Sequence, residues 1–399
     1  MSVVKPATAA VAEERKGPVS LDARQREILR LLWREGRLSR WELHRRTGVN
    51  PNAVGLDVGV LLNEKIVREC QSEVVGPGRP RIPLEIDPAV RHVIGIAVSP
   101  GKVEVGWLSL RGNPLGRPIA RATSNRAKTI AAAQALLKEA MNNQTLAIGL
   151  SVTGFVDPSQ RATLLSSSFA GQKAASLAPL YDIAGDRPLV LENNMHALAA
   201  WWSLIHQAES YEDVLLVAIN DGQAGAALLI DGRPNRGCVT GANELGHMRF
   251  FVETEMCYCG HRGCLERIGS TEFLRLRGVS SGTLMEHASR YQTENADPAA
   301  DKALDEVLDY LSAGLANAVN FIRPNRLVLA SELTRYPAFS AALQRSIRSR
   351  VLTEIVKRVR IDLWDQANSH SAETAGWLAL VTLYRDGWAT PRVNGDPKL

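Results

Sequence analysis

Apolar and polar residues in the first 90 positions follow a helical spacing and predict three short helices. In residues 21–36 the stripe Ile28, Leu29, Leu31 and Leu32 faces one side, while arginine and glutamate occupy the other. Further helices are expected over residues 41–47 and from residue 51 onward. The residues expected at the helix ends are the caps Ser39 and Asn50, the first-turn Pro51 and the turn glycines Gly36 and Gly48. The third helix is expected to bury Val54, Val58, Leu61 and Leu62.

The segment after the third helix predicts a wing. Two extended runs, residues 66–70 and 82–86, flank the loop GPGRPR at residues 76–81. Helix, short helix, glycine turn and helix is the order of a helix-turn-helix, whose last helix lies in the major groove. Residues 21–87 are therefore interpreted as a winged helix-turn-helix. An ordinary helical bundle or a protein-binding module is the alternative.

Charge supports a DNA partner for this segment. Residues 21–68 contain ten Lys and Arg against six Asp and Glu, a surplus of four, while the whole chain has a net charge of +5. The residues expected to contact DNA are Ser39, Arg40, Asn50, Asn52, Arg79 and Arg81. Asn52 suits adenine. Pro80 keeps Arg79 and Arg81 extended, as insertion into an A·T-rich minor groove requires, although a solvated linker is the simpler interpretation.

From residue 93 onward, strand and helix patterns alternate. Residues 93–110 and 214–234 each predict two strands around a glycine turn, and residues 129–143 and 189–205 predict helices, the second after a strand. This alternation is typical of an α/β protein with two similar lobes, and clefts between lobes bind small molecules. The expected organisation is an arm (1–20), the DNA-binding domain (21–87), a two-lobed body (88–390) and a tail (391–399). One lobe takes residues 88–205 plus the C-terminal helix, and the other residues 206–370.

Composition places the chain among globular proteins. Of its 399 residues 45% are hydrophobic and 22% charged. It has no uninterrupted run of about 20 apolar residues, and its N-terminus lacks the apolar core of a secretory signal. We expect a cytoplasmic protein without a membrane partner, in which disulfides are disfavoured.

Three of the five cysteines lie close together, in the stretch CYCGHRGCLER at residues 257–267. Cys257, Cys259 and Cys264, with either His247 or His261, would complete a closed tetrahedral site for one structural zinc ion per chain. A zinc finger is excluded because the cluster occurs once and lies far from the basic segment, and a redox motif does not match the spacing. Cys70 and Cys238 have no partners at useful spacing and are expected to be small core residues.

From about residue 20 to 390 the chain resembles the ROK family of repressors, open reading frames and sugar kinases, which share an actin-like sugar kinase fold. The resemblance rests on IGLSVTGFVDP (148–158), ENNMHALAA (192–200), DGRPNRG with ELGHM (231–248), CYCGHRGCLERIGS (257–270) and LANAVNFIRPNRLVLA (315–330). The fused N-terminal domain is similar to that of the family's xylose- and N-acetylglucosamine-type repressors. The family pattern favours His247 over His261 as the fourth metal ligand.

The resemblance also implies a sugar site without catalysis. By position, Asn193, Asn194, Glu244, His247 and Glu266 would bind sugar hydroxyls, although asparagine or glutamate at a helix start is more often a solvated cap. Asn194 stands where the family's kinases carry the Asp that acts as general base, and an amide cannot accept that proton. No catalytic residue is therefore expected, and the metal is expected to hold the loop that carries Glu266.

The two hairpins that would cradle nucleotide phosphates are altered as well. The family's Asp-x-Gly-Gly-Thr is replaced by AVSPG at residues 97–101, where Pro100 removes an N–H donor. The second turn contains Asp221, a carboxylate expected to repel phosphate. A sugar kinase with an added domain is the alternative function, and a pure interaction protein is another.

The expected function is sugar-dependent control of a palindromic, A/T-rich operator by a homodimer or tetramer. A sugar or sugar phosphate in the cleft would close the lobes and change the spacing of the two DNA-binding domains. The third helix departs from the family's repressors, because Pro51, Asn52, Ala53 and Gly55 replace hydroxyl-rich and basic residues. Gly55 and Gly59 weaken a helix by about 1 kcal/mol each.

Overall fold

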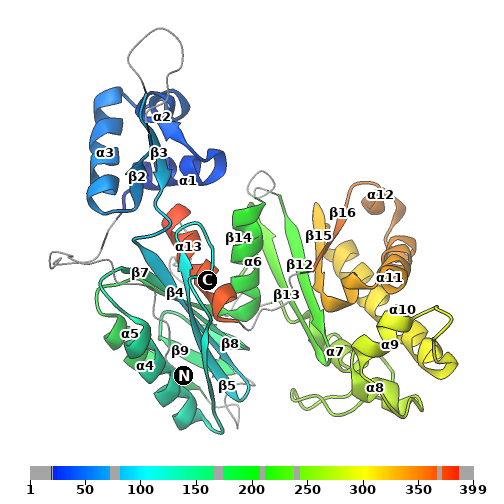
Figure 1. Ribbon diagram of the computed structural model, residues 1–399. Coiled ribbons are helices and arrows are strands. Elements are labelled where there is room, and N and C mark those ends of the chain that lie inside the picture. The colour runs from blue at the N-terminus through cyan, green and yellow to red at the C-terminus, as the bar shows by residue number, and fades with distance from the viewer. Residues whose placement is uncertain are drawn as a thin grey trace, which may run out of the picture. The chain divides into compact units, whose positions relative to one another are not determined.

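The computed structural model describes residues 19, 21–71, 81–165, 174–206, 212–237, 243–365 and 371–385, and the structural statements below concern these residues. The chain divides into two compact units. Unit 1 comprises residues 1–207 and 370–399, and unit 2 comprises residues 208–369. Each unit contains one five-stranded sheet, and Figure 1 labels the elements of both.

The predicted helices of the N-terminal segment are confirmed. They are α1 (Ala23–Glu35), α2 (Arg40–Thr47) and α3 (Pro51–Asn63). The predicted extended runs form β2 (Val67–Glu69) and β3 (Pro83–Ile86), and β1 (Leu38–Ser39) completes a sheet of order β1-β3-β2. Ser39 forms a capping box with Glu42 at the start of α2, and Asn50 caps α3. We call residues 21–87 the N-terminal module.

The buried face of α3 differs from the prediction. Val54, Val58 and Leu61 are buried as expected, but Asp57 is buried with them and Leu62 is only partly buried. Asp57 lies inside because Arg24 of α1 reaches it, with Nε 3.1 Å from Oδ2. A buried carboxylate is tolerated where a cation is paired with it. The exposed face of α3 therefore carries no charge.

The sheet of unit 1 has the order β11-β7-β4-β5-β6. Its strands are β4 (His92–Ser99), β5 (Lys102–Ser109), β6 (Ile119–Ala122), β7 (Thr145–Val152) and β11 (Leu189–Asn193). A small second sheet contains β8 (Phe155–Asp157), β9 (Ala162–Leu165) and β10 (Ala175–Ser176). Strands β4 and β5 form an antiparallel hairpin, and β7 and β11 continue the sheet in parallel.

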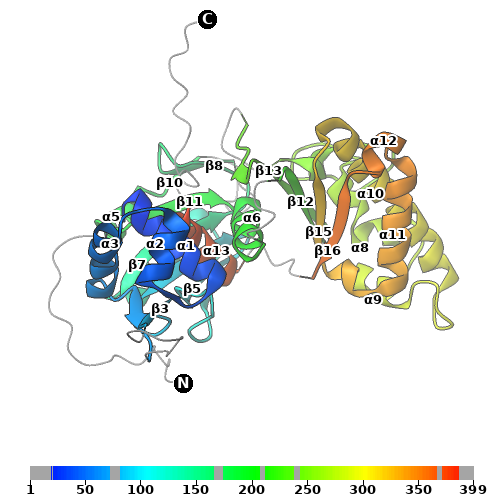
Figure 2. The same cartoon turned by 90° about the horizontal axis from the view of Figure 1, so that it is seen from above.

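Helices cover both faces of this sheet. α4 (Arg126–Ala140) and α5 (Ala178–Ala184) pack against the face that carries Ile94 and Ile96. α13 (Ala372–Tyr384) packs on the other face, beside α6 (Asn194–Ile205) and α1 (Figure 2). Its approach is very close, because a Cβ at Gly149 would lie 1.9 Å from the Ala375 carbonyl oxygen. The glycines of the predicted strands thus make room for α13.

The sheet of unit 2 repeats this plan, in the order β14-β13-β12-β15-β16. Its strands are β12 (Val214–Asn220), β13 (Gln223–Ile230), β14 (Arg233–Pro234), β15 (Arg326–Ser331) and β16 (Arg360–Trp364). Its helices are α7 (Leu265–Ile268), α8 (Thr271–Leu276), α9 (Leu284–Arg290), α10 (Pro298–Ile322), α11 (Pro337–Arg350) and α12 (Thr353–Val356). The apolar face of α10 forms much of the core. Among the described residues, no helix combines the length and apolar character needed to span a membrane.

Candidate functional site

A cluster of one imidazole and three thiols lies in unit 2. The ligand atoms of His247, Cys257, Cys259 and Cys264 all lie within 4.8 Å of one another. Cys257 Sγ is 3.7 Å from His247 Nδ1, and the Sγ atoms of Cys259 and Cys264 are 3.6 Å apart. In a tetrahedral zinc site with bonds of about 2.0–2.3 Å, neighbouring ligand atoms lie about 3.5–3.8 Å apart. The donor set and its spacing fit a tetrahedral metal ion that binds thiolates.

Backbone pairing brings the histidine to the thiols. Phe250 N donates to the Gly263 carbonyl over 2.8 Å, and Leu265 N donates to the Met248 carbonyl over 2.9 Å. Gly263 has a φ of +78°, and an added Cβ would lie 2.1 Å from the Phe250 carbonyl oxygen. Only glycine fits there. This short pairing joins residues 248–250 to residues 263–265. It therefore places His247, which directly precedes the first segment, beside the cysteine loop.

The other sulfur and imidazole groups considered from the sequence lie outside this cluster. His261 is exposed, and its Nδ1 lies 3.6 Å from Cys259 Sγ, but the group of four contains His247 in its place. Cys70 is a partly buried free thiol in the N-terminal module. Cys238 lies outside the described residues.

Burial favours the neutral form of the cluster thiols. It raises the pKa of Cys264 to about 11, and it also raises the pKa of Cys257. The thiolate is the form that binds a metal, and a divalent cation stabilises it. Metal binding and thiol deprotonation are therefore expected to be coupled.

Two carboxylates border the cluster. Cys257 Sγ donates to Glu266 Oε1 over 3.0 Å, and that oxygen lies 3.9 Å from His247 Nδ1. Glu244 Oε2 lies 3.6 Å from His247 Nε2, on the other side of the ring. Burial, together with the charge of Glu266, raises the pKa of Glu244 to about 7. The structure thus brings Glu244, His247 and Glu266 together, as predicted, and directs one oxygen of Glu266 at the thiols.

Tyr258 is a member of this site that the sequence reasoning missed. Its hydroxyl lies 2.8 Å from His247 Nε2. A metal on Nδ1 leaves the ring proton on Nε2, where Tyr258 and Glu244 can accept it. The only signal in the sequence is its position between two cysteine ligands, which does not specify a contact with His247.

Asn193 and Asn194 lie together in unit 1, whereas the other three predicted sugar-binding residues lie in unit 2. Asn193 Oδ1 accepts from Met195 N over 2.7 Å and Nδ2 donates to the Gly154 carbonyl over 2.6 Å, so this amide caps α6 and ties it to the β7–β8 turn. Asn194 is the first residue of α6 and is buried.

A buried histidine–glutamate contact flanks Asn194 in the sequence, and the sequence reasoning missed it as well. His196 Nδ1 lies 3.0 Å from Glu192 Oε2, and both side chains are buried. The contact links the end of strand β11 to the first turn of α6. It therefore helps to set the position from which Asn194 projects.

The two hairpin turns differ in how they are held. In unit 1, Pro100 follows Ser99, and Thr123 N donates to the Gly101 carbonyl over 2.8 Å. In unit 2, Asp221 accepts from Thr271 N over 2.7 Å and from the Thr271 hydroxyl. The Asp221 carboxylate is thus a tie to α8, a role that the sequence reasoning did not foresee.

The residues predicted to contact DNA have different environments. Ser39 is buried, and its hydroxyl donates to Glu42 over 2.6 Å, so it serves as a cap inside the module. Arg40 pairs with Glu69 at 2.9 Å. Asn50 accepts from Ala53 N over 2.9 Å. Asn52 is exposed on α3, and Arg79 lies outside the described residues.

Arg81 lies against an exposed tryptophan. Its guanidinium carbon is 4.1 Å from the centre of the Trp41 ring, and that of Arg45 is 5.7 Å from the same ring. Trp41 and Arg45 belong to α2, whereas Arg81 precedes β3. Cation–π contact holds the three side chains together at the surface. Trp41 and Arg45 were not predicted as functional residues.

Trp33 joins the N-terminal module to the rest of unit 1. Its Nε1 donates to the Leu204 carbonyl in the last turn of α6 over 3.1 Å. Its ring lies 6.0 Å from that of Trp377, at 90°, and 4.9 Å from that of Tyr384. Trp201 stacks on Trp377, with the two ring centroids 5.8 Å apart. We call these four aromatic residues the tryptophan junction.

Arginines complete the junction. Arg111 Nη1 donates to the Trp33 carbonyl over 3.0 Å, and its guanidinium carbon lies 5.0 Å from the Trp33 ring. Arg26 Nη1 donates to the Thr382 carbonyl. Helix α1 therefore contacts both α6 and α13 through aromatic packing and hydrogen bonds.

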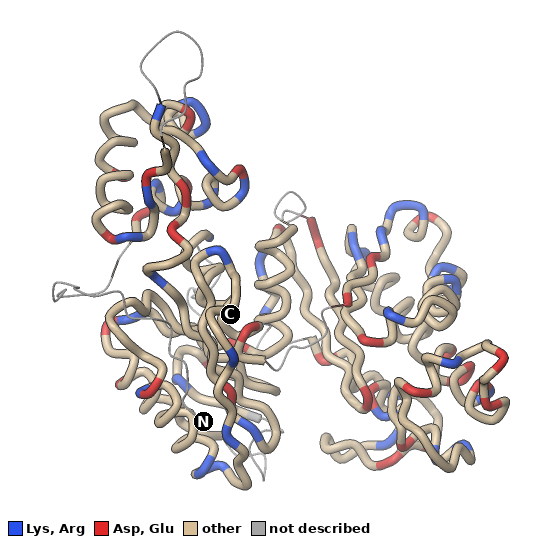
Figure 3. Tube along the Cα trace, in the orientation of Figure 1, with Lys and Arg blue, Asp and Glu red and all other residues tan. Residues whose placement is uncertain are grey.

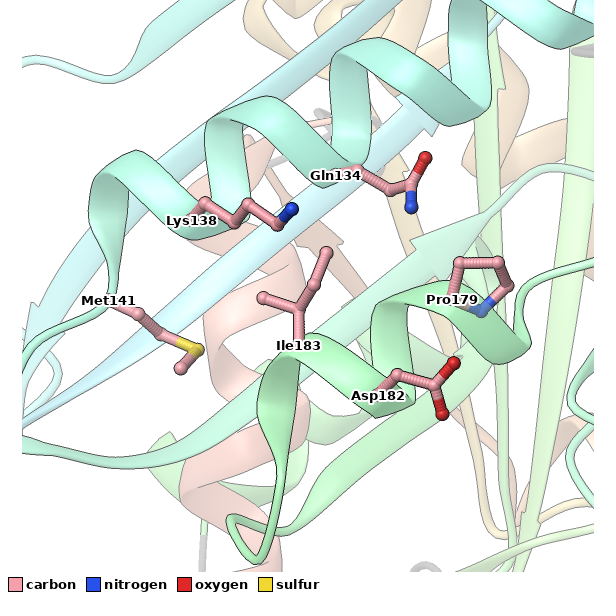
Figure 4. Close-up of a pocket in the computed structure, with 6 residues that line it drawn as sticks. All are labelled: Gln134, Lys138, Met141, Pro179, Asp182 and Ile183. Atoms are coloured by element: carbon pink, nitrogen blue, oxygen red, sulfur yellow. The ribbon is translucent and has the colours of Figure 1, made fainter.

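A groove of about 560 Å³ lies between α4 and α5, away from these sites (Figure 4). Its lining residues are Gln134, Lys138, Met141, Pro179, Asp182 and Ile183. It contains none of the predicted functional residues.

The chain is similar to known proteins in sequence and in fold. The family model described as ROK family matches residues 93–383. The chain is 23% identical to the xylose repressor of Bacillus subtilis strain 168, over 83% of this chain and 88% of that protein.

Two solved structures show the fold. A ROK family transcriptional regulator, described as a homolog of the E. coli MLC protein, matches with a TM-score of 0.74 and 18% identity over 90% of this chain and 96% of that one. A ROK family glucokinase from Streptomyces griseus, in complex with glucose and AMPPNP, matches with a TM-score of 0.58 and 20% identity over 72% and 99%. The chain thus has the actin-like fold shared by these ROK structures, and the match to the regulator covers more of the chain than the match to the glucokinase. The chain belongs to the ROK family.

Proposed function

We propose that this protein is a sugar-responsive transcriptional repressor acting in the cytoplasm. The N-terminal module, as a winged helix-turn-helix, binds DNA, and the ROK body binds a sugar or sugar phosphate. The observation that carries this proposal is the attachment of the module to the body at the tryptophan junction. Similarity over 83% of the chain to a named repressor supports it.

The DNA contacts are assigned residue by residue. Asn52 and Arg81 provide base and minor-groove contacts, together with Arg79, and Arg40 contacts phosphate once it leaves Glu69. Ser39 and Asn50 act through their caps, which set the starts of α2 and α3. A homodimer or tetramer binds a palindromic, A/T-rich operator, since one module reads one half-site.

The effector site is assigned to five residues. Asn193 and Asn194 at the start of α6, and Glu244, His247 and Glu266 at the metal loop, are the proposed hydroxyl-binding residues. His247, Cys257, Cys259 and Cys264 hold one zinc ion, which keeps the loop in place and supplies no reaction. Tyr258 and Glu244 orient His247 by accepting from Nε2.

Three positions support sugar binding without phosphoryl transfer. Asn194 cannot act as a general base. Pro100 offers no N–H to a phosphate in the first hairpin. In the second hairpin, Asp221 already occupies the Thr271 N–H, so a phosphate would meet a carboxylate there.

Helix α6 provides a direct link between the two proposed sites. It begins at Asn194, and the Leu204 carbonyl in its last turn accepts from Trp33 of the module. An effector that binds more tightly when α6 is in one of two placements shifts α6 toward that placement. The module follows, because the junction packs it on both α6 and α13. We propose that lobe closure on the effector changes the spacing of two modules in the oligomer.

Thermal stabilisation by a library of sugars and sugar phosphates tests the effector site. A stabilising compound should also change the affinity of the full chain for duplexes selected from a random DNA library. If no compound stabilises the protein and none alters DNA affinity, the effector part of the proposal fails. Phosphoryl transfer from ATP to hexoses is expected to be undetectable, and its detection would favour a sugar kinase.

A further inference from the structure

The exposed face of α3 carries almost no hydrogen-bonding groups. Its exposed residues are Pro51, Asn52, Leu56, Gly59, Val60 and Asn63. Between Pro51 and Asn63 the sequence contains no Lys, Arg, His, Gln, Ser or Thr, and Figure 3 shows α3 without a basic position. Leu56 is 74% exposed and Val60 41% exposed. This surface can therefore recognise apolar groups and, through the asparagines, amides or adenine.

The surroundings of α3 indicate a polyanionic partner. Arg45 and Arg81 lie on Trp41, and the charge of Arg81 also contributes to lowering the pKa of the Glu42 carboxyl. The acidic residues are held by other groups: Asp57 by Arg24, Glu35 by Arg34 and Arg46, Glu69 by Arg40, and Glu85 by Arg37 and Arg68. The one carboxylate of α3 thus points inward, and the guanidinium groups of Arg45 and Arg81 lie against Trp41 of α2 in the same module.

If the polyanion is DNA, the residues of α3 determine which base edges the helix can recognise. Guanine is read by two hydrogen bonds from Arg or Lys, which α3 does not have. Thymine presents a methyl group in the major groove, and apolar side chains contact it. Adenine suits Asn52. Apolar contact and the asparagine therefore both favour A·T pairs.

We propose that α3 reads its DNA site through the 5-methyl groups of thymine, which Leu56 and Val60 contact in the major groove. This inference rests on the proposed function. Gly55 and Gly59 assist, because a Cβ at either position would meet nothing within 4 Å, and its absence lets the helix backbone lie close to the bases. The specificity of this protein thus comes from apolar contact rather than from arginine–guanine pairs.

The test replaces single thymines by deoxyuridine, which pairs identically and lacks only the methyl group. The full chain is used to select duplexes from a random library, and affinities are then measured for each selected duplex and its deoxyuridine-substituted versions at fixed salt. Loss of one buried methyl should weaken binding about fourfold per contacted thymine. Deoxyuridine outside the half-sites should have no effect.

A matched pair of variants assigns the effect to α3. Leu56→Ala should weaken binding to the thymine duplex and abolish the difference between thymine and deoxyuridine at one position. Leu352→Ala removes a leucine that is 64% exposed in unit 2 and should leave both affinities unchanged. An effect of deoxyuridine through DNA shape would persist in Leu56→Ala, which would overturn the assignment.

The outcomes separate this inference from the proposed function. Salt-dependent DNA binding that is equal for thymine and deoxyuridine duplexes contradicts the inference alone. Failure to bind any duplex contradicts the proposed function and the inference with it. A change of oligomeric state in Leu56→Ala by light scattering, with unchanged DNA affinity, would show that α3 docks on protein.

Discussion

Two clusters tie distant segments of this chain together by different means. In unit 2, His247 meets three cysteines whose donor atoms suit a removable ion. In unit 1, Trp33 meets Trp377 through packing that needs no ion. A chelator should therefore release the first connection, whereas only substitution can break the second. Under the proposed function, the metal cluster shapes the effector site and the junction carries its signal.

The largest effect is expected from breaking the metal cluster. Cys259→Ser removes one of four donors, and structural zinc contributes on the order of 10 kcal/mol to the folding of its site. The native chain should contain one zinc ion and the variant none, measured by elemental analysis. Unfolding of unit 2 should shift to lower temperature, and effector stabilisation should be lost.

Cys70→Ser is the matched control, because Cys70 is a free thiol in the N-terminal module. It should keep zinc and effector response. A Cys259→Ser protein that responds to effector without zinc would contradict the role assigned to the cluster.

Breaking the junction should have the next largest effect. Trp33→Ala removes a partly buried ring and the hydrogen bond to Leu204, at a cost of about 2–4 kcal/mol in urea unfolding. DNA affinity should become insensitive to effector, because the module no longer follows α6. Trp41→Ala, which removes an exposed ring, should instead weaken DNA binding at little cost to stability. Coupling retained in Trp33→Ala would show that the signal takes another route.

Acid should weaken unit 1 independently of the metal. Burial, with the charges of Arg91 and Arg187, lowers the pKa of His92 from 6.5 to about 4. Below pH 6.5 the unfolded chain binds a proton at His92 that the folded protein does not, so the stabilising contribution is complete above 6.5 and is lost toward pH 4. The loss amounts to about 3 kcal/mol. His92→Gln should flatten the pH dependence of the unfolding free energy in this window; parallel profiles would refute the assignment.

The smallest effect concerns α3 itself. Gly55→Ala should stabilise the protein by about 1 kcal/mol, because alanine is preferred to glycine inside a helix and the added Cβ meets nothing within 4 Å. DNA affinity should fall, since the methyl group separates the helix from the bases. Gly59→Ala provides a second measurement. Tighter DNA binding by both variants would argue against close approach of the backbone.

Features that depend on neighbouring residues could be predicted from the sequence. The caps Ser39 and Asn50, the glycine turns and the strands on both sides of each hairpin are confirmed, because a few consecutive residues determine them. The cysteine spacing likewise indicated a compact ligand set. The function of the body was implied by resemblance, since the spacing of apolar residues indicates lobes but not their ligand.

The sequence by itself determined the helices, turns and metal-binding potential of this protein, and the tertiary structure decided what those elements touch. Asp221 meets Thr271, 50 residues away, and Trp33 meets Leu204, 171 residues away. The burial of Asp57 likewise depends on Arg24 from another helix. Such contacts depend on which helix faces pack together, and each face is compatible with many partners. Only the packed structure selects one, because close packing and hydrogen-bond geometry must be satisfied at every contact at once.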